Sequence, residues 1–347
     1  MTVLTFPRWA LYLLLVLLAL TLAFFAYGGF AETPGALLVT VVFWISLMQG
    51  SIALAATTEL TNARWIASLR QEMLAVHPLL LLGAVLFVFL IPLMPHYPWA
   101  DHPGLWLNEP FFIGRNLLLL LAAWFTGRQY ALKNLSQDPS SRRWAVIYLF
   151  VFVTSQSLIG FDLIMSLAYP WISTLFGAFF LVEALYGAIA LAGILFFLLY
   201  RAKSSRDPER TERHQRDVGM LLFGFSVLWG GLFFAQYLLL WYGNLPEETA
   251  FIVRRVSESP FRELSVIFII ANFVVPFFLL LSRRVKESPA LVAGVSLVVF
   301  LGLCLERVLY VMPILPVHSG ILFLQNLMFL LVWIIFVHNS PQIASAE

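Results

Sequence analysis

Long apolar segments separated by short polar breaks run through the whole chain. Ten of them are long enough to cross the hydrocarbon core of a bilayer, which takes about 20 helical residues. A helix surrounded by lipid is apolar on all sides, so segment length and polar breaks, rather than periodicity, place the ends. The ten predicted spans are residues 8–29, 36–57, 74–94, 111–132, 144–167, 172–200, 217–242, 263–282, 289–311 and 318–338.

The composition supports the same fold class. The 347 residues are 61% hydrophobic and only 12% charged, whereas soluble domains carry about 25% charged residues. We therefore predict an all-α polytopic membrane protein. The net charge of +2 does not indicate a nucleic-acid partner, because the basic residues lie in short loops between apolar spans. The first apolar run is too long for a signal peptide and lacks a small-residue cleavage pattern, so we interpret it as the first span.

The distribution of lysine and arginine predicts the orientation. With the N-terminus on the cytoplasmic side, sixteen of the 21 Lys and Arg residues fall on that side and three on the other. Arg115 and Arg307 lie inside spans. Cytoplasmic loops carry the excess of positive charge in membrane proteins. The sequence therefore predicts that both termini face the cytoplasm.

The loops on the two sides differ in kind. Residues 94–110, with four prolines and two tryptophans, and residues 243–263 resemble ordered loops on the outer side that dock a partner. An aromatic belt with ordinary loop prolines is the alternative. On the cytoplasmic side, residues 201–217 form a polar connection that we expect to be mobile. Residues 58–72 indicate a short helix, either lying in the membrane interface or simply connecting two spans.

Polar residues at membrane depth are the clearest functional signal. A charged residue inside a span costs roughly 2.5 to 3.5 kcal/mol on the lenient insertion scale. Most of these polar residues lie in the outer half of the membrane, and Glu183 lies near the midplane. The candidates for a proton path or a quinone pocket are Asp162, Glu183, Gln236, Glu306, Arg307, Arg115 and Gln156.

Two readings of these residues stay open. In one, carboxylates and amides converge on a cavity that binds a small polar headgroup or relays protons. In the other, Arg115 and Arg307 pair with Asp162, Glu183 or Glu306 and only hold helices together. The adjacent residues Glu306 and Arg307 point about 100° apart on a helix and need separate partners.

The sequence predicts no metal or haem in this chain. The single cysteine, Cys304, excludes an internal disulfide and a thiolate-bound iron–sulfur or Cys-type zinc site. Of the six histidines, His77 and His338 lie within spans near the cytoplasmic end. Facing histidines deep inside helices, which a membrane haem requires, are not predicted. No phosphate-binding loop or nucleophile motif occurs.

Three stretches together resemble a known family. They are WLNEPFFIGRNLLLLLAAWF (106–125), SQSLIGFDLIMSLAYPWISTLFGAFF (155–180) and FFAQYLLLWYGNLPEETA (233–250), and LERVLYVMP (305–313) fits as well. The resemblance, in matching order over about two thirds of the chain, is to the second polysulfide-reductase-type (NrfD-like) membrane subunit of alternative complex III, a quinol:cytochrome c oxidoreductase. Leu163 and Ala168 stand where that family more often has a tryptophan and a second acid.

The resemblance implies a fold, a location and partners. It implies two four-helix bundles, at about 36–167 and 172–311, flanked by peripheral helices 8–29 and 318–338, within a single membrane domain of the bacterial cytoplasmic membrane. It implies a scaffold role with possible proton conduction or a quinone pocket, and no redox activity of this chain alone. Haem and iron–sulfur clusters would be carried by partner subunits, namely an NrfD-like paralogue, an iron–sulfur/molybdopterin-like subunit and c-type cytochromes.

Other functions stay open on the residues alone. One alternative is a quinone-reactive membrane anchor for another molybdopterin or multihaem oxidoreductase. A second is a purely structural subunit, in which Asp162 and Glu183 can be neutralised together without loss of turnover. A third is a secondary transporter, which would require helices broken near the midplane, whereas only Pro276 interrupts a span centrally.

Overall fold

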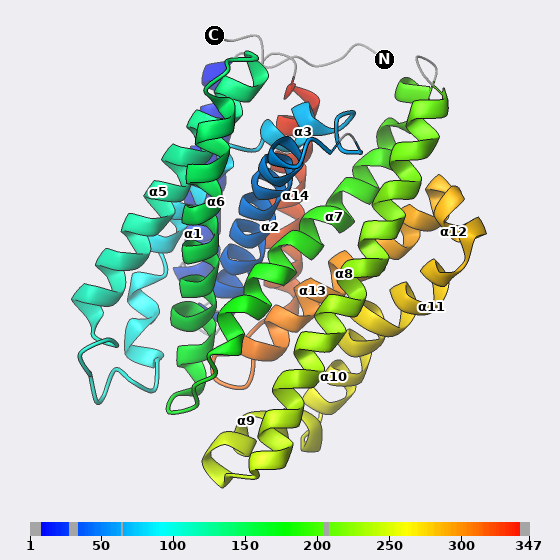
Figure 1. Ribbon diagram of the computed structural model, residues 1–347. Helices are drawn as coiled ribbons and strands as arrows, with labels where there is room; N and C mark the ends of the chain where they lie inside the picture. The colour runs from blue at the N-terminus through cyan, green and yellow to red at the C-terminus, as the bar shows by residue number, and fades with distance from the viewer. Residues whose placement is uncertain (1–7, 28–33, 64, 205–207, 341–347) are drawn as a thin grey trace.

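A computed structural model describes residues 8–27, 34–63, 65–204 and 208–340. These residues form helices and connecting turns, with no β-strand among them (Figure 1). Within this described part, nine helical segments are long and apolar enough to cross a membrane. The apolar part of the first helix, Trp9–Phe24, is shorter than these nine. The fold class predicted from composition is thus confirmed as an all-helical, multi-pass architecture.

Each predicted span corresponds to one helix or one interrupted helix. Residues 28 and 29 of the first predicted span lie outside the described residues. The spans are α1 (Arg8–Tyr27), α2 (Pro34–Leu60), α3 with α4 (Arg70–Leu74, Leu79–Val88), α5 (Glu109–Leu135), α6 with η2 and η3 (Ser141–Leu158, Ile159–Ile164, Met165–Ala168), α7 (Leu175–Ser204), α8 (Pro208–Gly243), α10 with η4 and α11 (Phe261–Ile269, Ile270–Val274, Val275–Leu281), α13 (Pro289–Val311) and α14 (Ser319–His338). Between them lie η1 (Ile91–His96), α9 (Pro246–Ser257) and α12 (Arg283–Glu287).

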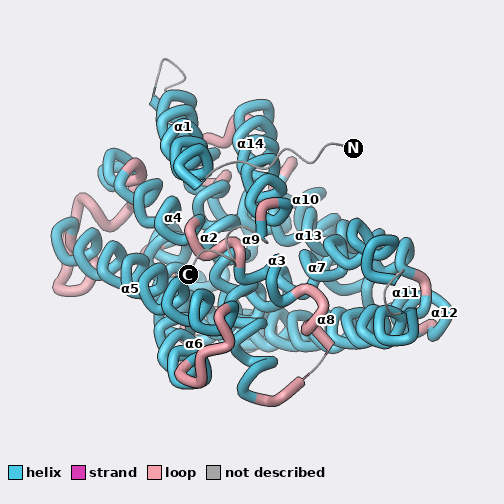
Figure 2. Tube along the Cα trace, turned by 90° about the horizontal axis from the view of Figure 1, so that it is seen from above, coloured by secondary structure: helices cyan, strands magenta, loops and turns pink. Residues whose placement is uncertain are grey.

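Helix α2 is the centre of the packing. It contacts α4, α5 and α6 on one side, α7 and α13 on another, and α1 and α14 on a third. Its most apolar window is entirely buried inside the protein. Figure 2, a view along the helices, shows α2 surrounded by the others. Its close crossing with α7 depends on Gly50, where an added Cβ would lie 2.1 Å from the carbonyl oxygen of Ala184.

The two ends of the molecule are distinct. Helix α1 begins and α14 ends at the upper end in Figure 1. The opposite end, which we call the far end, carries α9, the segment between η1 and α5, and the turn between η3 and α7.

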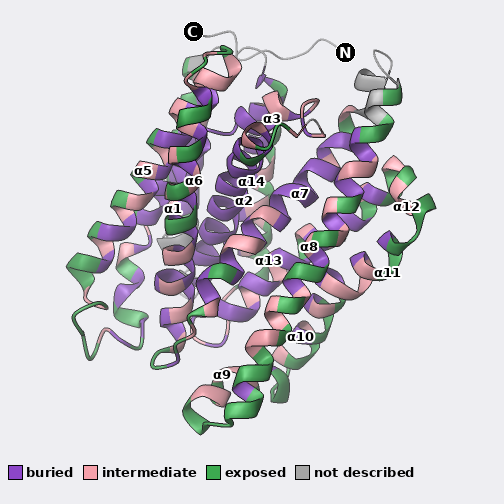
Figure 3. Cartoon of the chain, in the orientation of Figure 1, coloured by how far each residue is buried: buried purple, intermediate pink, exposed green. Residues whose placement is uncertain are grey.

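Burial follows the layers of helices. Figure 3 shows buried residues concentrated along α2 and α7, with exposed residues on the outward faces of the surrounding helices. Helix α1 buries Leu11, Leu15, Leu18 and Leu22 and exposes Trp9 and other apolar residues on its other face. An apolar residue left outside costs little in lipid, and so this pattern is the one expected of a membrane protein.

Three spans are interrupted rather than continuous. The third predicted span, residues 74–94, instead runs from Arg70 to Val88, with turns around Pro78. Proline has no backbone N–H and cannot continue the hydrogen-bond ladder of a helix. The other two interruptions are π-helical segments, η2 and η4, which the apolar pattern did not predict.

The connections are more helical than expected. The segment 201–217, expected to be mobile, is largely taken up by α7 continuing to Ser204 and α8 beginning at Pro208. Residues 243–263 contain α9. In residues 58–72 the described part consists of the end of α2, turns and the start of α3, and Ile66 and Leu69 are fully buried. Of the two alternatives for this segment, burial of those apolar side chains in the protein core favours the plain connection over a helix lying in the membrane interface.

Candidate functional site

The polar residues predicted from the sequence do not converge on one cavity. The structure places them in two buried ionic groups, one buried amide group and one separate position. We name the Asp162 cluster (Arg115, Asn116, Asp162 and Ser166), the Glu183 cluster (Glu183, Asn272, Glu306, Arg307 and Tyr310) and the amide cluster (Gln49, Ser155 and Gln156). Among the described residues, no hydrogen bond or ion pair joins one cluster to another.

Asp162 lies in the π-helical segment η2, near the far end of the span that begins with α6. A π-helical turn inserts a residue into an α-helix and changes the direction in which neighbouring side chains point. Gly160 allows this turn to approach α7, because an added Cβ would lie 2.9 Å from the ring of Phe180. The Asp162 side chain is fully buried as a result.

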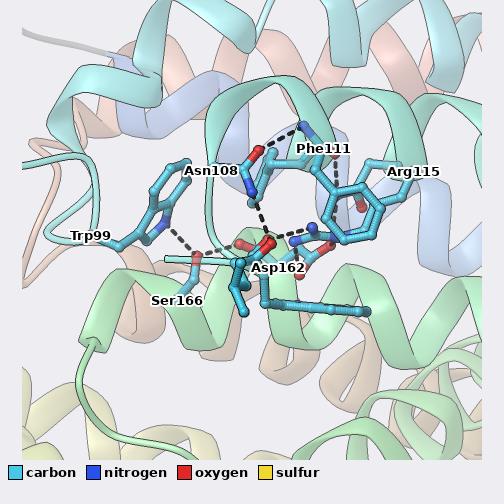
Figure 4. Close-up of polar contacts among 10 residues, drawn as sticks. Trp99, Asn108, Phe111, Arg115, Asp162 and Ser166 are labelled. Atoms are coloured by element: carbon cyan, nitrogen blue, oxygen red, sulfur yellow. Dashed lines mark hydrogen bonds and ion pairs between the residues drawn. The ribbon is translucent and has the colours of Figure 1, made fainter. Parts of the chain in front are cut away.

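The Asp162 carboxylate has a complete set of donors. Arg115 donates to both of its oxygens, from Nε at 2.7 Å and from Nη2 at 2.8 Å. Asn116 donates to Oδ2 from Nδ2 at 2.7 Å. The remaining Arg115 nitrogen, Nη1, donates to the carbonyl of Trp106 at 2.6 Å, and the guanidinium lies 4.3 Å from the centre of the Trp106 ring. This forked ion pair (Figure 4) is electrically neutral without any bound proton.

The loop between η1 and α5 donates two side-chain hydrogen bonds to the segment around Asp162. The Trp99 indole donates to the Ser166 hydroxyl at 3.3 Å, and that hydroxyl donates to the backbone carbonyl of Asp162 (Figure 4). The Tyr97 hydroxyl donates to the carbonyl of Leu163 at 3.1 Å. Burial, and then the charge of Asp162, raises the pKa of the Tyr97 phenol, which therefore stays a neutral donor. Trp99 and Tyr97 are buried, so the aromatic-belt reading is wrong for these two residues.

A cavity of about 500 Å³ adjoins the Asp162 cluster at the far end. It is bounded by Trp106, Phe161, Asp162, Ser166, Tyr169 and Trp171. Its volume falls in the range of small-molecule sites, which are mostly apolar with a few placed polar groups. An aromatic-walled cavity beside a carboxylate can accept a ring that carries a hydroxyl or carbonyl group.

The Glu183 cluster joins three spans in the middle of the protein. Arg307 on α13 donates from Nη2 to Oε2 of Glu183 on α7 at 2.6 Å, and its guanidinium lies 4.0 Å from the centre of the Phe180 ring. Glu306, the neighbour of Arg307, accepts instead from the amide of Asn272 at 3.2 Å and the hydroxyl of Tyr310 at 3.0 Å. The prediction that Glu306 and Arg307 need separate partners is confirmed.

This cluster contains two carboxylates and one guanidinium. Glu183 and Glu306 also interact with each other, and all three charged side chains are buried. The cluster is neutral when it holds one proton and has one net negative charge when it holds none. A buried net charge is costly at membrane depth. Charge balance in this cluster therefore favours one bound proton, whereas the Asp162 cluster is neutral without one.

Several polar atoms of this cluster have no partner among the described residues. They are Nε and Nη1 of Arg307 and Oδ1 of Asn272. Asn272 lies in η4, the second π-helical segment, and an added Cβ on Gly302 would lie 2.2 Å from its Oδ1. Spare donors and an acceptor beside two carboxylates supply places where a water or a proton can be held.

The amide cluster lies between α2 and α6. Gln156 donates to Oε1 of Gln49 at 2.9 Å, and Gln49 donates to the hydroxyl of Ser155 at 3.1 Å. The close contact of Gly50 with Ala184 brings the backbone next to Gln49 against the backbone next to Glu183. The amide cluster and Glu183 therefore both lie at the crossing of α2 with α7.

Gln236 belongs to none of these groups. It lies on α8, half-buried, and borders a separate cavity near α9. In contrast, Arg115 pairs with Asp162 and Arg307 pairs with Glu183, as the pairing interpretation predicted. Glu306 has no arginine partner and is bound by Asn272 and Tyr310.

Several members of these clusters were not predicted from the sequence. Asn272 and Gln49 are isolated amides in otherwise apolar spans, the same signal that identified Gln156. Tyr310 follows Glu306 by four residues and so lies on the same helix face. Asn116 is likewise an amide in an otherwise apolar span, next to Arg115, and it donates directly to Asp162.

Comparisons of this chain with models of known protein families and with curated proteins find no match.

Proposed function

We propose that this chain is an integral membrane subunit of a quinol-oxidising complex similar to alternative complex III. The observation that carries the proposal is a buried carboxylate, Asp162, that borders an aromatic-walled cavity of about 500 Å³ in a span of a polytopic membrane protein. The cavity has the size and chemistry for a quinone headgroup. The sequence resemblance supplies the class of complex.

In this proposal the chain acts mainly as a scaffold that binds redox subunits, which carry the haems and iron–sulfur clusters. The packing of α2 to α6 and of α7 to α13 around the α2–α7 crossing supports an arrangement of two bundles with α1 and α14 at the periphery. Both termini lie in the cytoplasm of a bacterial cell, and the far end faces outward, as the distribution of basic residues favours.

The two ionic clusters have different parts in the proposed function. The Asp162 cluster, with its neighbouring cavity, is the quinone-pocket candidate. The Glu183 cluster is the proton-conduction candidate, since its charge becomes balanced on binding one proton. A quinone-reactive anchor of another molybdopterin or multihaem enzyme would use the same cavity with different partners.

The test is purification of the tagged chain in mild detergent, followed by mass spectrometry and a visible spectrum. We expect haem-containing and iron–sulfur subunits to co-purify with quinol oxidation activity. A colourless, solitary protein would contradict the complex.

A second comparison separates the scaffold role from the pocket and proton roles. The Asp162→Asn/Glu183→Gln double variant is assayed in the purified complex, with Thr154→Val, at an exposed position of α6, as the control. Loss of turnover in an assembled complex supports the pocket and proton roles. Full turnover supports a purely structural subunit.

A further inference from the structure

A second cavity, of about 300 Å³, lies between α8, α9, α10 and α13. Its lining includes four phenylalanines, Phe179, Phe233, Phe251 and Phe268, and the polar side chains of Gln236 and Arg255. We call it the Arg255 pocket. Tyr237 and Val256, which also line it, are exposed, so the pocket opens at the surface of the protein.

Arg255 is a buried cation without an acidic partner. Its guanidinium donates to three backbone carbonyls: Nη1 to Phe251 at 2.6 Å, Nε to Leu309 at 3.2 Å and Nη2 to Tyr310 at 3.2 Å. No carboxylate among the described residues forms an ion pair with it. Burial lowers the pKa of Arg255 to about 10, which leaves it charged at neutral pH.

The carbonyls of Leu309 and Tyr310 belong to the last turn of α13, whose C-terminus has a partial negative charge. Arg255 therefore caps this helix, which is a structural role. A helix terminus supplies only about half an elementary charge, so the cap neutralises the guanidinium in part. The rest of its positive charge lies at the wall of the Arg255 pocket, beside the Phe251 ring.

Gln236 provides a second, independent observation. Its half-buried amide lines the pocket and has no hydrogen-bond partner among the described residues. Because the amide is only half-buried, it is accessible to a ligand in the pocket that can supply the missing partner. Donors from Gln236 and Arg255 thus face one apolar space.

The position of the pocket indicates where its ligand comes from. Helix α9 connects two spans and lies at the far end, beyond the membrane-crossing segments (Figure 1). Lipid headgroups lie at this level and acyl chains lie below it. A ligand that enters between Tyr237 and Val256 therefore comes from the bilayer.

We propose that the Arg255 pocket binds an amphiphile with an oxyanion headgroup, a phosphate or a carboxylate, and an alkyl chain. The headgroup accepts from Arg255 and from the Gln236 amide, and the chain packs on the phenylalanine rings. Guanidinium groups pair with both oxyanions through parallel hydrogen bonds. An anionic phospholipid and a free fatty acid share this chemistry.

The test uses the purified full-length chain, stripped of lipid and incubated with a phosphatidylglycerol that carries a photoreactive acyl chain. Peptide mass spectrometry then locates the cross-links. We expect them in residues 233–237 and 251–256, with competition by unlabelled phosphatidylglycerol and not by phosphatidylcholine. Stronger competition by oleate than by phosphatidylglycerol would identify a fatty acid as the source.

Two variant pairs test the contacts. Arg255→Gln should lower the apparent affinity at these peptides at least tenfold, the loss of a charge-assisted hydrogen bond. Arg254→Gln removes the same charge from an exposed position on the same helix and should leave labelling unchanged. Gln236→Leu should lower the affinity about fivefold, the loss of one neutral hydrogen bond. Its control is Gln129→Leu, another half-buried amide without a partner, outside the pocket.

Three outcomes overturn the proposal: equal labelling in Arg255→Gln and the unchanged protein, equal competition by phosphatidylcholine, or competition by a short-chain ubiquinone alone. If Arg255→Gln does not fold, the comparison of Gln236→Leu with Gln129→Leu decides. The labelling needs no partner subunit, so its result is independent of whether redox subunits co-purify.

Discussion

The Asp162 and Glu183 clusters both hold a carboxylate against an arginine inside apolar helices, yet their charge counts differ. Arg115 and Asn116 occupy both oxygens of Asp162, and the pair is neutral as it stands. In the Glu183 cluster one guanidinium faces two carboxylates, and two of its nitrogens have no partner among the described residues. Burial of an acid alone therefore does not call for a bound proton, whereas an unbalanced buried charge does.

The largest effect is expected when one member of the balanced Arg115–Asp162 pair is removed. Arg115→Gln should lower the free energy of unfolding by about 3 to 5 kcal/mol, because it leaves the Asp162 carboxylate buried and unpaired. Adding Asp162→Asn should restore part of this loss. Unfolding in mixed detergent would measure both. A single variant as stable as the unchanged protein would mean that the pair is not buried as described.

Substitutions in the Glu183 cluster, whose charges are unbalanced, should have smaller effects. Glu306→Gln replaces the carboxyl that is balanced only by a bound proton with a neutral amide, and it keeps the Arg307–Glu183 pair. Its free energy of unfolding should therefore change by less than about 1 kcal/mol. Glu183→Gln takes the closest partner from Arg307 and should cost about 1.5 to 3 kcal/mol.

Infrared spectroscopy can show which of the two clusters holds a protonated carboxylic acid. A band of a protonated carboxylic acid should be present in the unchanged protein and in Asp162→Asn, and absent in Glu306→Gln. A band lost in Asp162→Asn instead would reverse the assignment of the two clusters.

A third change disturbs the Glu183 cluster through its packing. In Gly302→Ala the added Cβ would lie 2.2 Å from Oδ1 of Asn272 and push its amide away from Glu306. We expect a loss of about 1 to 3 kcal/mol in unfolding free energy, as for other overpacked sites. Gly294→Ala on the same helix has no atom within 4 Å and should be neutral or slightly stabilising. Equal effects of the two alanines would argue against the close contact.

The smallest effect concerns an ion pair outside the membrane. The backbone N–H of Ser140, and then the side chain of Lys133, lower the pKa of Asp138 from 3.8 to about 2. Because the folded state favours the ionised form, this contribution is complete above pH 3.8 and is lost as the pH falls toward 2. Asp138→Asn should remove this part of the acid dependence, with a small shift in the thermal midpoint that high salt reduces further. An unchanged acid profile would contradict it.

Much of the fold follows from the sequence alone. The length and spacing of the apolar segments determine where spans occur, because a helix must cross about 30 Å of hydrocarbon with its backbone satisfied. The ends of α13 and α14 agree closely with the predicted ranges 289–311 and 318–338. The cost of a buried charge likewise made Asp162, Glu183 and Arg307 identifiable without a structure.

The tertiary structure decided which of these residues meet. Asp162 and Arg115 are 47 residues apart and Glu183 and Arg307 are 124 apart, and nothing in local sequence selects these pairs over the alternatives. The π-helical turns that carry Asp162 and Asn272 depend on neighbouring helices, since their apolar sequences are compatible with an uninterrupted α-helix. Apolar length sets the spans, whereas the contact between helices sets the partners and therefore the charge of each buried cluster.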